Sequence, residues 1–136
     1  MTGRLPGGGL IHADAGLTGG AFELFEMVMD AGGGPPGHVH LERDEAFYAL
    51  EGRFSIVCDG ARSDLRPGGF AFVPRGSVHH FKALTDHARI LFVVAPAGLE
   101  GFFRELARMT AGDSVTDGEA RLVLAGRFDS YPAAPA

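Results

Sequence analysis

The chain of 136 residues is 46% hydrophobic and 21% charged, which is typical of a single folded domain and argues against disorder. The net charge is −5 with scattered basic residues, and no run of about 18 apolar residues occurs, so we expect neither a nucleic-acid partner nor a membrane span. A single cysteine, Cys58, cannot form an internal disulfide, and the N-terminus lacks the apolar core of a secretory signal, so a cytoplasmic location is expected.

Short apolar runs separated by Gly and Pro predict an all-β sandwich or barrel between about residues 10 and 96. The runs are four to eight residues long in most cases, as strands are. The predicted strands are Phe22–Met29, Val39–Leu41, Glu45–Leu50, Arg53–Cys58, Phe70–Val73, Val78–Leu84 and Arg89–Val94. The residues expected to form the lining and core are Phe47, Phe54, Phe72, Phe81 and Phe92.

After Pro96 the apolar residues change to helical spacing, so we predict a helical segment over about residues 98–126. A first amphipathic helix should pack an apolar stripe against the β part. A second, weaker helix is predicted at Asp117–Ala125, and the tail SYPAAPA is expected to be loose. The stripe of the first helix consists of Leu99, Phe102, Phe103, Leu106 and Met109.

Two histidines, His38 and His40, stand two residues apart and therefore project side by side if the segment is extended. The GGGPPG run before them favours extended backbone. Glu45 lies an odd number of residues from His40, so an unbroken strand would turn it to the other face. The polar residues 42–44 favour a bend or bulge that allows Glu45 to join the histidines.

A third histidine, His79, follows a turn at Pro74–Gly76 and begins the next predicted strand. Three imidazoles and one carboxylate suit a divalent transition metal and leave room for water or substrate. A pair of histidines alone also occurs by chance as polar residues at the start of a strand, so this second segment favours the metal interpretation. His80 should point to the opposite face, and His12 and His87 are expected to face solvent.

The two segments together resemble the motifs of the cupin family. The first motif has the form G-x5-HxH-x3,4-E-x6-G, which the chain supplies from Gly32 to Gly52. The second has the form G-x5-PxG-x2-H-x3-N, which the chain supplies from Gly68 onward, except that Ala83 stands where Asn is usual. If Ala83 points inward, the pocket is slightly larger and more apolar. The C-terminal helical segment is similar to that of small quercetin-dioxygenase-like cupins.

The resemblance implies a jelly-roll β-barrel with one or two C-terminal helices, a metal inside and often a homodimer. The implied metal ligands are His38, His40, Glu45 and His79. The metal itself stays open among Fe, Mn, Ni, Co, Cu and Zn, because affinity alone rarely selects it. Glu45 is also the candidate catalytic residue, as a general base that leaves the metal transiently.

Three functions remain open for such a site, and each would act on or hold a small molecule. The first is a metal-dependent dioxygenase acting on a small aromatic or enolic compound. The second is a redox-neutral cyclase or isomerase, for instance on a polyketide intermediate, in which the metal polarises a carbonyl. The third is a module that only binds a ligand, which we rank last because all four metal ligands are present.

Glu23 and Glu26 fall on opposite faces of one strand, so at most one faces the interior.

Overall fold

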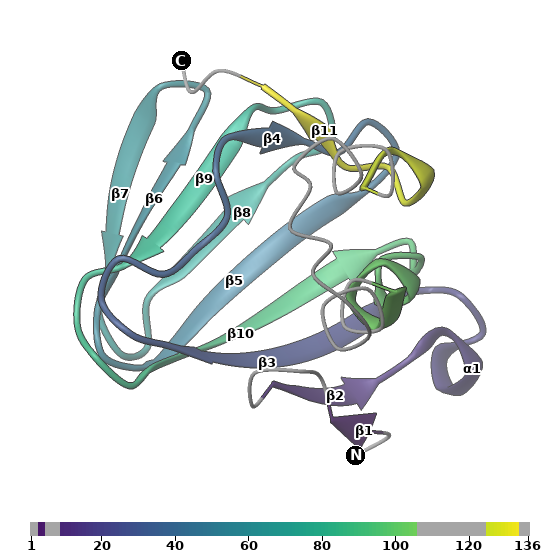
Figure 1. The fold of residues 1–136 in the computed structure, drawn as a ribbon, viewed down its shortest axis with the longest axis horizontal. Helices are drawn as coiled ribbons and strands as arrows, with labels where there is room; N and C mark the ends of the chain where they lie inside the picture. Colours follow the sequence, from purple (N-terminus) through teal and green to yellow (C-terminus); the bar gives the residue numbers. More distant parts are fainter. Residues whose placement is uncertain (1–2, 5–8, 106–124, 134–136) are drawn as a thin grey trace, which may run out of the picture.

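The computed structural model describes residues 3–4, 9–105 and 125–133, which form two antiparallel sheets packed face to face (Figure 1). This architecture confirms the predicted all-β, jelly-roll fold. The first sheet has the order β1 (Gly3–Arg4), β2 (Leu10–Ala13), β3 (Glu23–Met29), β10 (Ala88–Ala95), β5 (Asp44–Glu51) and β8 (Phe70–Val73). The second has the order β11 (Tyr131–Pro132), β4 (His38–Val39), β9 (His79–Ala83), β6 (Phe54–Cys58) and β7 (Ala61–Leu65).

The core lies between the sheets, because every second side chain of the central strands points inward. In β10, buried and half-buried residues alternate along the whole strand. Phe47 of the first sheet meets Phe81 of the second, with ring centroids 5.1 Å apart. Phe54 and Phe92 are buried in the same cluster, as predicted.

Phe72 was wrongly expected in the core. Its side chain is 54% exposed, and Phe70 beside it is 62% exposed. In β8 it is Val73 that is buried, while Phe72 lies opposite Ala46 on the outer face of β5. The segment FAFV is apolar on both faces, so the sequence pattern does not show which face is covered.

Several elements of the structure were not predicted. The strand β7 is exposed over its first four residues, so it lacks the apolar alternation of the predicted strands, and β1, β2 and the short helix α1 (Ala15–Thr18) were also not predicted. The tail was expected to be loose, but its residues Tyr131–Pro132 pair with β4. For the strands among these elements, pairing with a neighbouring strand rather than local propensity fixes the conformation, whereas α1 is capped at its N-terminus by the side chain of Asp14.

Residues 100–105 are helical, as the periodicity predicts, and so are residues 125–127. The apolar stripe packs on the β part as expected, since Leu99 is buried in the core cluster and Phe102 and Phe103 lie against it. The remainder of the two predicted helices falls on residues 106–124, which lie outside the described residues.

The N-terminal turn of the 100–105 helix is capped by a buried carboxylate from a distant strand. Glu23, on the inner face of β3, accepts hydrogen bonds from the backbone N–H groups of Gly98 (2.9 Å), Leu99 (2.7 Å) and Glu100 (3.2 Å). The first N–H groups of a helix have no partner within the helix, and a negative charge there is favourable. Glu23 is therefore the inward-facing glutamate of the pair considered above, and its contacts assign it a structural role.

Replacing Glu23 with alanine is expected to lower the free energy of unfolding by about 2–4 kcal/mol, because three N–H groups lose a charged acceptor in a buried position. Urea unfolding measures this change. The free energy of unfolding of Glu23→Gln should fall between those of the wild type and Glu23→Ala, since the amide retains one oxygen acceptor. The exposed Glu51→Ala is the control and should change stability by less than about 0.5 kcal/mol; an equally small effect of Glu23→Ala would contradict the capping role.

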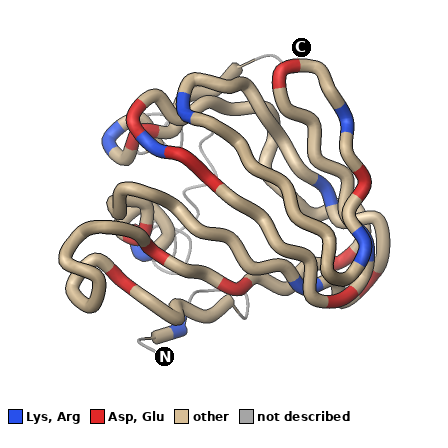
Figure 2. Tube along the Cα trace, turned by 180° about the vertical axis from the view of Figure 1, so that it is seen from behind, with Lys and Arg blue, Asp and Glu red and all other residues tan. Residues whose placement is uncertain are grey.

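Charged residues of both signs are dispersed along the described trace, and most blue segments have a red neighbour (Figure 2). Arg89 illustrates this, because its guanidinium contacts Glu26 and Glu51, each at 3.1 Å. His12 was expected to face solvent, but its Nε2 contacts Glu26 at 2.9 Å, while His87 is exposed as expected. Among the described residues, no helix is long and apolar enough to cross a membrane.

Candidate metal centre

Two histidines from distant segments meet because β4 pairs with β9. His38 lies directly opposite His79 in this antiparallel register, and directly opposed residues of such a pair are close neighbours. Their ring centroids are 4.2 Å apart. His40, two residues after His38, follows the end of β4, and its ring centroid lies 4.9 Å from that of His38 and 5.4 Å from that of His79.

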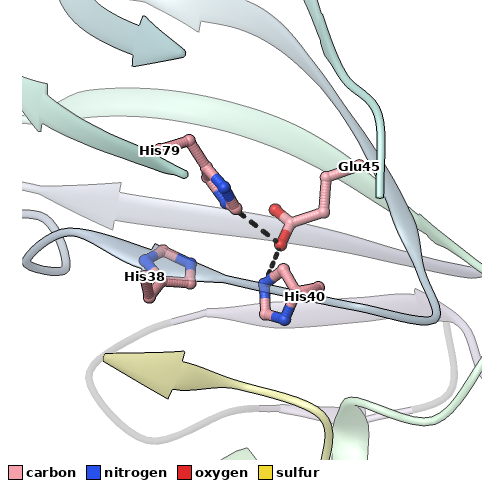
Figure 3. Close-up of side chains that lie close together, drawn as sticks. All are labelled: His38, His40, Glu45 and His79. Atoms are coloured by element: carbon pink, nitrogen blue, oxygen red, sulfur yellow. Dashed lines mark ion pairs between the residues drawn. The ribbon is translucent and has the colours of Figure 1, made fainter. Parts of the chain in front are cut away.

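The expected change of direction between His40 and Glu45 is present. The backbone bends at residues 41–42, and β5 then begins at Asp44. Strand β4 is accordingly shorter than predicted and ends at Val39. Glu45 is buried on the inner face of β5 and points between His40 and His79 (Figure 3). Its Oε1 touches the Nε2 of His40 and lies 3.7 Å from the Nε2 of His79.

All three imidazoles are held by backbone carbonyl groups at Nδ1. His38 contacts the carbonyl oxygen of Pro36 (2.8 Å), His40 that of Asp129 (2.7 Å) and His79 that of Ser77 (3.0 Å). A carbonyl oxygen can only accept, so each Nδ1 carries a proton, and in the neutral form of each ring the Nε2 keeps a lone pair. This is the arrangement that second-sphere hydrogen bonds impose on metal-binding histidines.

The Nε2 atoms of the three histidines, which do not contact these carbonyls, face a common point. Within the described part of the chain, the Nε2 atoms of His40 and His79 are buried and make no hydrogen bond of acceptable geometry, even though that of His40 touches Glu45. One ligand atom from each of His38, His40, Glu45 and His79 lies within 4.8 Å of every other. Buried polar atoms normally have partners, and a cation between these four atoms would satisfy them all. The residues therefore fit a metal ion.

The ionisation of the cluster also suits a cation. Burial acts to raise the pKa of Glu45, but the adjacent His40 and His79 imidazoles bring it down to about 2. Burial, together with the neighbouring His79, lowers the pKa of His38 to about 4. Burial would also lower the pKa of His40, but the Glu45 carboxylate outweighs it and raises that pKa above the usual value. At neutral pH the site thus holds an ionised carboxylate and a neutral His38, as metal ligation requires.

A backbone hydrogen bond joins the two cupin-like segments. The N–H of Gly76 donates to the carbonyl of His40 at 2.7 Å. Gly76 has a φ of 84°, a left-handed conformation that glycine adopts without steric cost. Next to it, Arg75 donates from its backbone and its guanidinium to Asp44, the residue before Glu45. The turn that leads into His79 is therefore fixed against both ends of the His40–Glu45 segment.

The remaining candidates fall outside the cluster. His80 is half-buried and points away from it, as the alternation along β9 predicts. Ala83 is buried on the same face as His79 and packs in the hydrophobic core. Asp129 was not predicted, although it contacts His40 directly. It lies 89 positions away in the chain, so no local pattern could have associated the two residues.

Comparison with known sequences places these features in a family. Residues 25–94, which include all four clustered side chains, match the family described as cupin domain. The chain is also 33% identical over 86 residues to the quercetin 2,3-dioxygenase of Bacillus subtilis (strain 168). That match covers 60% of this chain but only 26% of the relative, so the chain spans about a quarter of its length.

Solved structures agree on the fold. KdgF from a Halomonas species superposes with a TM-score of 0.60 at 23% identity, covering 67% of this chain and 82% of that one. TT1209 from Thermus thermophilus superposes with a TM-score of 0.53 at 29% identity, covering 57% of this chain and 74% of the other. The arrangement of the strands, the two motifs and the family match lead to one conclusion: the chain belongs to the cupin family.

Proposed function

We propose that the protein binds one divalent transition metal ion through His38, His40, Glu45 and His79 and acts as a dioxygenase on a small aromatic or enolic compound. The observation that carries the proposal is the cluster itself: four potential ligand atoms lie within 4.8 Å of one another, each histidine with its Nδ1 already occupied. The similarity to a quercetin 2,3-dioxygenase supports the choice of reaction.

These four ligands would neither neutralise a divalent ion nor fill an octahedral coordination sphere. Three neutral imidazoles and one carboxylate give a divalent ion a net charge of +1, and an octahedral ion keeps about two adjacent positions open. Bound there, such an ion would supply Lewis acidity and, if it is redox-active, electrons for a reaction with dioxygen. A substrate with two neighbouring oxygens, such as a hydroxy-ketone, matches the two positions.

The four side chains of the cluster would have two roles, holding the ion and accepting a proton from the substrate. His38, His40 and His79 keep their orientation through the carbonyls of Pro36, Asp129 and Ser77. Glu45 is buried and is the carboxylate at the centre, so we assign it the second task of accepting a proton from the substrate. Its pKa of about 2 makes it a better ligand than base, and proton acceptance therefore requires Glu45 to move away from the imidazoles.

Oxygen consumption tests the proposed reaction. Protein reconstituted with Fe²⁺, Mn²⁺, Ni²⁺, Co²⁺ or Cu²⁺ is expected to consume oxygen when a flavonol or a β-diketone is added. A Glu45→Gln variant should lose at least about 100-fold in turnover, which is the usual contribution of a positioned general base. Full turnover in a metal-loaded Glu45→Gln variant would remove Glu45 from the chemistry.

The same assay separates the alternatives. No oxygen uptake with any of these metals would rule out the dioxygenase. Turnover of a carbonyl substrate under anaerobic conditions with Zn²⁺ would instead assign the site to a cyclase or isomerase, because zinc acts only as a Lewis acid. A protein that purifies without metal and gains nothing from added metal would be a ligand-binding module.

We also propose that the protein forms a homodimer through the outer face of its first sheet. Phe70 and Phe72 of the edge strand β8 lie opposite Tyr48 and Ala46 of β5 on this face. The exposed fractions are 62% for Phe70, 54% for Phe72 and 44% for Tyr48. A cluster of exposed aromatic side chains marks an interaction surface, and a second copy of the chain would cover it symmetrically.

Replacing Phe72 with glutamate is expected to shift the protein from dimer to monomer at micromolar concentration, because each copy would bury an unpaired charge in the proposed interface. Size-exclusion chromatography with light scattering measures the mass. Leu17→Glu is the matched control, since Leu17 is 68% exposed on α1, away from this face, and should leave the mass unchanged. A monomeric wild-type protein would contradict the proposed dimer.

A further inference from the structure

One buried carboxylate near the cluster belongs to neither of its motifs. Asp129 lies between the helical residues 125–127 and β11, in the yellow C-terminal segment that runs beside β4 (Figure 1). It is almost fully buried. Its Oδ1 accepts the backbone N–H of Leu41 and its Oδ2 that of Glu42, both at 2.8 Å. These two donors form the bend that connects His40 to Glu45.

The backbone of Asp129 acts on the same segment. Its carbonyl oxygen accepts the Nδ1–H of His40 at 2.7 Å, which leaves the Nε2 of that ring facing Glu45. The residue has a φ of 62°, a left-handed conformation that aspartate tolerates better than most residues. The side chain and the carbonyl of one residue thus hold a candidate ligand and the bend that leads to the next one.

The position of Asp129 is itself fixed from both sides. On either side of it, the backbone N–H groups of Phe128 and Ser130 donate to the carbonyl of Ala125, each at 3.0 Å. After it, β11 pairs with β4, where Pro132 lies opposite His38. The C-terminal segment is therefore bound to the histidine strand along its edge, and Asp129 is held where that edge meets the bend.

The charge of Asp129 is balanced within the same network. The Nη1 of Arg43 lies 3.1 Å from its Oδ2, and the Nη2 of Arg43 lies 3.4 Å from the carbonyl of Ala97. This guanidinium passes so close to Gly98 that a Cβ there would come within 2.2 Å of it. A buried carboxylate with a paired arginine and two backbone donors is fully satisfied, so the contact carries no penalty for an unpaired charge.

From these contacts we infer that Asp129 is a positioning residue of the metal centre: its carboxylate holds the His40–Glu45 bend, its carbonyl orients the His40 ring, and the C-terminal segment thereby sets the affinity of the site. This inference rests on the proposed metal binding. Groups that hold the ligands of a metal typically change its affinity about 10–100-fold when they are removed.

The test compares Asp129→Gly and Asp129→Asn with the wild type. Glycine adopts a φ of 62° without steric cost, so Asp129→Gly removes the carboxylate alone. Asparagine also tolerates this conformation and keeps one oxygen acceptor, but its NH₂ group faces N–H donors. The dissociation constant for Co²⁺ is measured by chelator competition, and the visible absorption of the bound Co²⁺ reports the geometry of its ligands.

We expect Asp129→Gly to weaken Co²⁺ binding by about 10–100-fold and to change the Co²⁺ spectrum, with Asp129→Asn between it and the wild type. If Asp129 were needed only for folding, its replacement would lower the thermal stability of the metal-free protein. The Co²⁺ affinity and the Co²⁺ spectrum of the folded fraction would then stay unchanged. Asp86→Gly is the control, because Asp86 also accepts a backbone N–H, from Ala31, at the opposite end of β9 from His79.

Two results overturn the inference, and they are distinguishable. If the wild type binds Co²⁺ and a folded Asp129→Gly binds it with the same affinity and spectrum, the positioning role alone fails. If the wild type binds none of the metals above, the proposed function fails and the inference falls with it. Should Asp129→Gly not fold, Asp129→Asn decides the question by the same two readouts.

Discussion

Replacing His79 with alanine is expected to abolish stoichiometric metal binding, whereas replacing its neighbour His80 is expected to leave it intact. His79 is buried, donates from Nδ1 to Ser77 and has a buried Nε2 without a hydrogen-bond partner among the described residues. Its loss removes one of the proposed direct ligands, so affinity should fall by more than the roughly 10–100-fold that loss of a supporting group costs. His38→Ala and His40→Ala should act in the same direction.

His80 is a matched control because it offers the same ring on the adjacent residue. It is half-buried on the other face of β9, so His80→Ala changes the imidazole content of the protein without touching the cluster. Each protein is prepared without an affinity tag or chelator, and its metal content is measured by elemental analysis and chelator competition. Stoichiometric metal in a His40/His79 double variant, or equal losses in His79→Ala and His80→Ala, would contradict the assignment.

His38, His40 and Glu45 could be grouped from the sequence because their relative geometry follows from local rules. The alternation of a strand places His38 and His40 side by side, and a polar interruption before Glu45 permits the reversal of phase that the bend at residues 41–42 provides. His79 is a candidate because it begins a predicted strand after a turn, and the resemblance to a known family strengthens this assignment, since nothing local shows that β4 pairs with β9.

The contacts of Asp129 with the cluster could not be predicted in this way. Asp129 meets the His40–Glu45 bend through contacts that span 86 to 89 positions in the chain. Its neighbours in the sequence form part of a segment that we expected to be helical or loose. Only the docking of β11 on β4 brings it into position, and strand pairing over such a separation leaves no trace in local periodicity.

Two errors in the fold have different physical causes. Strand β7 is polar and exposed, but the residues Asp59 and Gly60 before it both have positive φ, at 49° and 83°. An Asp-Gly pair between two strands is a strong signal for a two-residue hairpin, so β7 could have been predicted from its turn. The exposure of Phe72 could not have been predicted, because both faces of FAFV are apolar. Which face turns outward depends on the pairing of β8 with β5.

The core beneath the cluster carries the second large prediction: Phe47→Ala is expected to lower the free energy of unfolding by about 3–5 kcal/mol. Phe47 is fully buried on the same face of β5 as Glu45, and its ring lies 5.1 Å from that of Phe81 and 6.2 Å from that of Phe92. Alanine leaves a cavity between the two sheets that these neighbouring rings cannot fill. Phe47→Leu retains most of the volume and should cost less.

Urea unfolding of the metal-free protein measures this effect separately from any stabilisation by bound metal. Phe22→Ala is the control for the same substitution, because Phe22 lies just before β3 and is 38% exposed, and it should cost less than about 1 kcal/mol. A comparably small change in Phe47→Ala would mean that the two sheets are not packed through this ring. Since Glu45 lies two residues along the same strand, the support that Phe47 gives to β5 is also what holds the carboxylate between His40 and His79.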